Sequence, residues 1–115
     1  MTIIQFLDGL IEKTQNASIK WEDEGNSYRL VLLSGSVLFK AVYNANTENF
    51  DFVMKVFDGA QEFASYYCDL EDSYNEEMYN RFSDLLNAIN EQKTKIINSK
   101  LDKLYADLAT PELPL

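Results

Sequence analysis

The sequence contains no histidine and only one cysteine among its 115 residues, and both shortages exclude chemistry. Without histidine, the chain lacks the commonest general base, the Ser-His and Cys-His nucleophile pairs, and the imidazole ligands of metal sites. With Cys68 as its one thiol, a single chain can form neither an internal disulfide nor a zinc site built from thiolate or imidazole ligands. We therefore expect no metal and no cofactor.

Basic residues are scarce too: ten stand against nineteen acidic residues, for a formal net charge of −9. This balance disfavours direct binding to nucleic acid, which depends on Lys and Arg to neutralise phosphates, and binding to anionic membranes. It suits a basic protein partner, and it also suits the simpler role of keeping a small protein in solution. Residues 1–90 carry fifteen acidic and six basic side chains, a net −9, whereas residues 91–115 carry four of each.

Glycine is rare, and long apolar runs are absent. The four glycines stand singly, so no phosphate-binding or dinucleotide-binding glycine motif is present. No apolar run approaches the roughly 20 residues that span a bilayer, and the first residues do not resemble a signal peptide. We therefore expect a cytoplasmic protein. Its length and its 46% hydrophobic content predict one domain over residues 1–110, with residues 111–115 as a frayed tail.

The hydrophobic period predicts an α+β fold. Apolar residues recur at helical spacing over residues 2–16, with Thr2 as the N-cap and Asn16 as the stop. Alternation and turn residues then predict an antiparallel β-meander of four to five strands: residues 19–22, 28–33, 37–43, 50–57 and, unless it begins a helix, 61–68. Helical spacing returns after Asp72, where Ser73 and Glu76 match a capping box. A break at Asn98-Ser99 predicts that the C-terminal part forms two helices.

This order resembles that of a group of small uncharacterised bacterial, phage or mobile-element proteins. The resemblance lies in an N-terminal helix, the segment Ile19-Lys20-Trp21-Glu22, a meander, and a Leu-Asp-Lys-Leu terminal helix over residues 101–104. It implies the same fold and no known activity.

The segment from Asp69 to Glu77 is the strongest candidate for a functional surface. Its acids favour the start of a helix, because they interact well with the helix dipole. Their spacing does not match a calcium loop. With tyrosines nearby, the segment also predicts a docking surface for a basic protein. The predicted protein-binding residues are Asp69, Glu71, Asp72, Glu76, Glu77, Tyr66, Tyr67 and Tyr74. Cys68 has acidic neighbours, which disfavour a reactive thiolate, so we expect a buried or half-buried structural cysteine.

The middle strands are apolar at successive positions, so both faces of the sheet carry apolar side chains. Either the helices divide between the two faces, or a second chain covers one of them.

Taken together, the acidic charge, the tyrosines and the missing catalytic motifs predict a non-catalytic protein-binding module. It would occupy a basic partner surface, as immunity and anti-defence inhibitors of similar size and charge do. The alternatives are a homodimeric accessory protein that associates through the second sheet face and a hydrolase that uses carboxylates alone.

Overall fold

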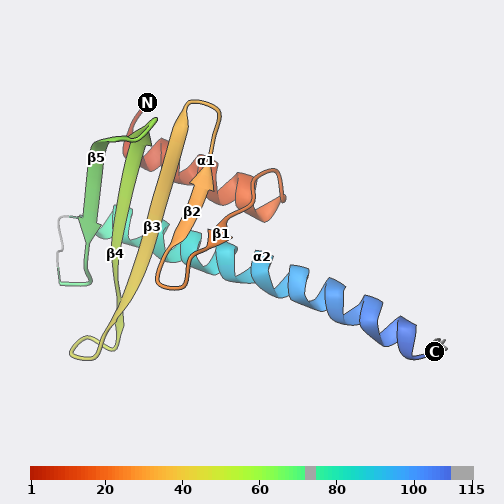
Figure 1. The fold of residues 1–115 in the computed structure, drawn as a ribbon. Coiled ribbons are helices and arrows are strands. Elements are labelled where there is room, and N and C mark those ends of the chain that lie inside the picture. Colours follow the sequence, from red (N-terminus) through yellow and green to blue (C-terminus); the bar gives the residue numbers. More distant parts are fainter. Residues whose placement is uncertain (72–74, 110–115) are drawn as a thin grey trace.

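A computed structural model describes residues 1–71 and 75–109. The fold is α+β: an N-terminal helix, a five-stranded antiparallel meander and a long C-terminal helix (Figure 1). In chain order, the elements are α1 (Ile3–Gln15), β1 (Glu22–Asp23), β2 (Tyr28–Val31), β3 (Gly35–Asn44), β4 (Asn49–Asp58), β5 (Gln61–Cys68) and α2 (Glu76–Leu108). The strands lie in the sheet in sequence order.

The helix α1 begins where the sequence predicts. The Thr2 side chain accepts a hydrogen bond from the Gln5 N–H, and the Gln5 side chain accepts one from the Thr2 N–H, at 3.2 and 2.9 Å. This capping box satisfies two backbone donors that the helix itself leaves without partners. Asn16 is the C-cap, also as expected.

The helix α2 is one continuous element, so the prediction of two C-terminal helices is wrong. Asn98 and Ser99 lie inside it, because Asn and Ser cost a helix only a few tenths of a kcal/mol each and neither Gly nor Pro interrupts the run. Its N-cap is Asn75, which places Glu76 at the first helical position and not at the third position of a capping box. Ser73 lies outside the described residues.

The first strand is shorter than predicted, because a side chain takes the place of a neighbouring strand. The buried Gln92 amide of α2 donates hydrogen bonds to the carbonyls of Ile19 (2.8 Å) and Thr14 (3.2 Å) and accepts one from the Trp21 N–H (3.4 Å). The Trp21 indole N–H also donates to the Thr14 hydroxyl at 2.9 Å. These bonds hold residues 19–21 against the helices, and the chain joins the sheet only at Glu22.

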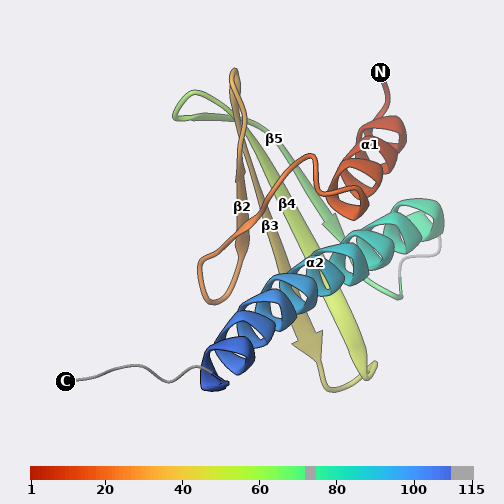
Figure 2. The same ribbon diagram turned by 90° about the vertical axis from the view of Figure 1, so that its right-hand side faces the viewer.

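Both helices pack on the same face of the sheet (Figures 1 and 2). Three stacked phenyl rings join the layers: Phe39 of β3, Phe52 of β4 and Phe82 of α2, with centroids 5.7–5.8 Å apart. Of the two arrangements that the sequence left open, the one in which the helices divide between the faces is therefore wrong. The other face, which we call the open face, carries Leu38, Lys40, Val42, Val53, Lys55 and Tyr67 and is covered by no described element.

Candidate functional site

The structure describes only part of the predicted acidic surface, the segment from Asp69 to Glu77. Asp69 is half-buried and Glu71 exposed just after β5, and Glu76 and Glu77 are exposed in the first turn of α2. Asp72 and Tyr74 lie outside the described residues. The Glu77 carboxylate lies 3.7 Å from the Arg81 guanidinium one turn later. Acids at this position stabilise the helix through its dipole, whatever else they do.

The two tyrosines of β5 do not share one surface. Because successive residues of a strand point to opposite faces, Tyr66 packs against the core beneath the helices, whereas Tyr67 stands on the open face with 57% of its area exposed. Partial desolvation, with the carboxylates of Asp51 and Asp69 nearby, raises the pKa of Tyr67. Its phenol therefore stays neutral at physiological pH and keeps its hydrogen-bond donor.

Cys68 is a core residue, as the sequence predicts. It is fully buried, and its sulfur lies 3.5 Å from the Asn75 carbonyl at the start of α2. A thiol in such a place is not a reactive nucleophile, because burial disfavours the thiolate. Within residues 1–71 and 75–109, no three acidic or cysteine side chains are grouped so that they could hold a metal ion.

A second candidate site, which the sequence did not predict, lies beside the start of β2. β2 pairs with residues 36–39 of β3, but β3 continues to Asn44. Beyond Phe39, no strand of the described chain borders β3 on the β2 side, although β4 pairs with β3 over its whole length. We call this stretch of β3, residues 40–44, the half-edge.

The ladder geometry shows which backbone groups of the half-edge are available. The Leu32 N–H donates to the Gly35 carbonyl at 2.8 Å, so Gly35 directs its hydrogen-bonding groups toward β2. In an antiparallel ladder these groups alternate along the strand. With the regular register through β3, Ala41 and Tyr43 therefore direct their N–H and C=O groups out of the half-edge, whereas Lys40 and Val42 direct theirs to β4.

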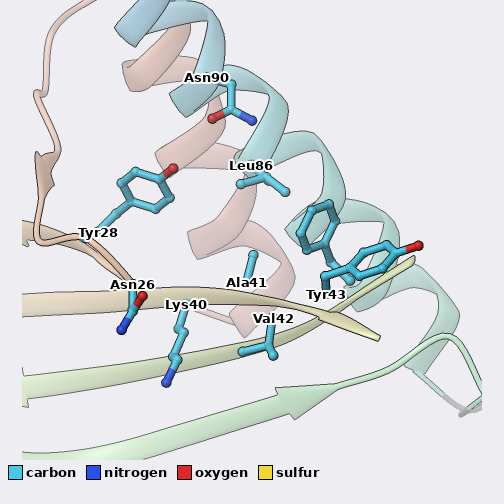
Figure 3. Close-up of a pocket in the computed structure, with 10 residues that line it drawn as sticks. Asn26, Tyr28, Lys40, Ala41, Val42, Tyr43, Leu86 and Asn90 are labelled. Carbon is cyan, nitrogen blue, oxygen red and sulfur yellow. The ribbon is translucent and has the colours of Figure 1, made fainter. Parts of the chain in front are cut away.

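An open hollow of about 500 Å³ adjoins the half-edge on the helix side of the sheet (Figure 3). Tyr28, Leu86 and Asn90 stand around it, and Lys40 and Val42 point away from it toward the open face. The rings of Tyr43 and Phe50 meet edge to face at its end, with centroids 5.8 Å apart. The other lining residues are Gly25, Asn26 and Ala41.

The turn before β2 explains why the hollow exists. The Gly25 N–H donates to the Asp23 carboxylate at 2.8 Å, and the Glu24 N–H donates to the Ser27 carbonyl at 2.9 Å. Gly25 has a φ of 91°, a left-handed conformation that favours glycine. This tight turn joins β1 directly to β2, so β2 begins at Tyr28, opposite Phe39, and no described strand extends the sheet alongside the half-edge.

The lining of the hollow suits recognition better than acid–base chemistry. It offers aromatic and apolar surface, two asparagine amides and the backbone groups of the half-edge. None of the described residues that line it carries a carboxylate, a thiol or an imidazole. The sequence carries no clear signal of this site: it predicts strands of similar length at residues 28–33 and 37–43, whereas β2 has four residues and β3 has ten.

Comparisons of the chain with known proteins and structures found no relative. No protein-family model, no curated protein and no solved structure matches the chain. Among the residues that the structure describes, no helix is both long enough and apolar enough to cross a membrane.

Proposed function

We propose that this chain is a non-catalytic protein-binding module that takes an extended, basic segment of a partner protein alongside the half-edge of β3. The observation that carries the proposal is the end of β2 pairing at Phe39, five residues before β3 itself ends. A strand edge with free N–H and C=O groups is a template for a further strand.

The shape of the site supports an extended occupant. A segment paired antiparallel or parallel to the half-edge would bond to Ala41 and Tyr43 through its main chain. Its alternate side chains would point to the helix side, into the hollow beside Tyr28 and Leu86. Main-chain bonds provide affinity in this mode of binding, and the hollow provides selectivity for side chains.

Charge supports a basic occupant. Residues 1–90, which contain the half-edge, carry the whole net charge of −9. The exposed acids Glu71, Glu76 and Glu77 are part of this charge. A negative body attracts a basic segment over a distance of about a Debye length, which speeds its encounter at low salt. The segment from Asp69 to Glu77 would therefore contribute to binding through its charge.

An association of two copies through the open face has weaker support. The absence of a covering helix leaves this face free, which favours the idea. Lys40 stands on it, however, and so do the ion pairs Arg29–Glu24 (3.1 Å) and Lys55–Glu62 (3.6 Å). Two copies stacked face to face would remove these charged groups from water, which costs binding energy.

Selection from a display library of random 12-residue peptides tests the proposal. We expect the selected peptides to be richer in Lys and Arg than the library, and their affinity to fall as salt rises. Ala41→Pro removes one outward N–H and fills its place with the ring, without removing a bond to β4, and it should abolish binding. Val42→Ala, which changes only a side chain on the open face, should leave binding intact.

A second variant separates loss of binding from loss of folding. Asn90→Trp fills the hollow from an exposed helix position and does not alter β3. We expect it to weaken peptide binding while circular dichroism and the Tm stay close to those of the wild type. Selected peptides of acidic composition, or binding that both Ala41→Pro and Asn90→Trp leave unchanged, would contradict the proposal.

A further inference from the structure

The last turns of α2 carry an apolar stripe that touches nothing else in the described chain. From residue 94 onward, every described residue of the helix is exposed, and the helix projects well past the edge of the sheet (Figures 1 and 2). The stripe consists of Ile97, Leu101, Leu104 and Leu108, whose exposed fractions run from 52% to 73%. Isolated helical segments of this length are marginal in water without packing.

The stripe is not a continuation of the core-facing side of the helix. Phe82, Leu85 and Ile89 face the sheet, and at 3.6 residues per turn the stripe lies roughly a quarter of a turn away from them. Its spacings of four, three and four are the a and d positions of a heptad, which is the pattern of a helix that packs along a second helix. The preceding positions of the same pattern are Asn90 and Thr94, both polar, so the apolar seam begins at Ile97.

We propose that two copies of this chain associate through these stripes as a short antiparallel coiled coil. In the register that keeps all four positions in contact, Ile97 packs against the partner's Leu108, and Leu101 against the partner's Leu104. Symmetry repeats both layers, so the seam has four apolar layers and no polar one.

The flanking charges select the antiparallel arrangement. In this register, the heptad places Lys100 beside the partner's Asp107, and symmetry makes the pair twice. A parallel dimer would instead place Lys100 toward the partner's Tyr105, where no charge complements it. Like and opposite charges at such flanking positions are what set orientation in coiled coils.

The distribution of net charge points the same way. Residues 91–115 are neutral, with four acidic and four basic side chains, whereas residues 1–90 carry −9. Two copies can therefore approach through this end of the chain without net repulsion. The antiparallel arrangement also keeps the two acidic bodies at opposite ends of the seam, where salt screens their repulsion.

The expected dimer is reversible and depends on concentration. On each copy, the stripe and Tyr105, which is 77% exposed, present on the order of 600 Å² of exposed surface. If the two copies buried all of it, the interface would reach only the low end of the ~1,200–2,000 Å² that specific interfaces bury. This inference goes beyond the proposed peptide site, which lies on the globular body, and each can fail without the other.

Sedimentation equilibrium of the full chain over a wide concentration range tests the proposal with matched variants. Leu104→Asp places a charge in the seam and should raise the Kd of dimerisation by roughly tenfold or more. Ala106→Asp adds the same charge on the opposite side of the exposed helix and should leave the Kd close to that of the wild type. Peptide binding at the half-edge should survive both changes, which separates this test from that of the proposed function.

A charge swap tests the orientation. Lys100→Asp sets two acids beside each other twice in the antiparallel dimer and should weaken it, and Asp107→Lys should do the same with bases. The double variant, Lys100→Asp with Asp107→Lys, should restore dimerisation. A wild-type chain that stays monomeric at millimolar concentration, equal effects of Leu104→Asp and Ala106→Asp, or no rescue by the double variant would each overturn the proposal.

Discussion

Replacing Gln92 with Met tests how the connection after α1 is held to the rest of the fold. The two side chains are similar in length, so packing should change little, but the amide and its hydrogen bonds are lost. Gln92 is 9% exposed, and its donors reach the carbonyls of Ile19 and Thr14 at 2.8 and 3.2 Å. Its oxygen accepts from the Trp21 N–H at 3.4 Å, the weakest of the three bonds.

The expected loss follows from these contacts. Each hydrogen bond contributes about 0.5–1.5 kcal/mol net, and a buried polar group left without a partner costs about 1–3 kcal/mol. Two short bonds and one long bond, with partial access of water to residues 19–21, therefore predict a loss of about 2–4 kcal/mol of unfolding free energy. That is a large fraction of the stability of a domain of this size.

Urea unfolding, followed by the fluorescence of Trp21, measures this loss directly, because the chain has one tryptophan and it lies in the affected segment. Gln15→Met on the exposed side of α1 is the control, and we expect it to change stability by less than about 0.5 kcal/mol. A loss below about 1 kcal/mol for Gln92→Met, at an unchanged m-value, would refute the view that this amide holds the connection in place.

Three further predictions concern single positions. Gly9→Ala should stabilise the protein by about 0.5–1 kcal/mol, because the added methyl group meets open space on α1. Gly35→Ala should destabilise it by about 1–3 kcal/mol or more, because the methyl group would collide with a backbone carbonyl of β4. Thermal unfolding of the two variants measures both effects. The hydrogen bonds from Lys93 and from the Gly25 N–H lower the pKa of Asp23 below 3.8. The stability that this carboxylate contributes is therefore present above pH 3.8 and is lost as the pH falls through the lowered pKa. In Lys93→Met, an NMR titration should show the pKa of Asp23 closer to 3.8. Cys68 should react with an aromatic disulfide reagent only as fast as the protein opens, and rapid labelling of the folded chain would contradict its burial.

Much of the fold could be predicted from the sequence, because hydrophobic period and turn residues are local signals. The Thr2 cap, the Asn16 stop and the antiparallel meander are confirmed. The extent of β1 could not be predicted, because it depends on Gln92, which lies more than 70 residues away in the chain. The break expected at Asn98 failed because propensity alone does not end a helix that lacks Gly or Pro.

The candidate site was harder to predict, because it arises from where β2 begins relative to the length of β3. Composition showed the acidic charge, and that charge remains part of the proposed function. Nothing in Ala41 or Tyr43 marks them as backbone ligands, since their significance comes from the register of β2 and β3. The expectation that the tyrosines of β5 form one acidic surface neglected that Tyr66 and Tyr67 point to opposite faces.

Backbone amide hydrogen exchange along β3 tests the central claim most directly. In the free protein, the amides of Ala41 and Tyr43 should exchange faster than those of Lys40 and Val42, because only the latter two bond to β4. On addition of a selected basic peptide, Ala41 and Tyr43 should become protected, while Lys40 and Val42 change little. Equal protection of all four amides in the free chain, or protection by the peptide that appears away from the half-edge, would contradict the account.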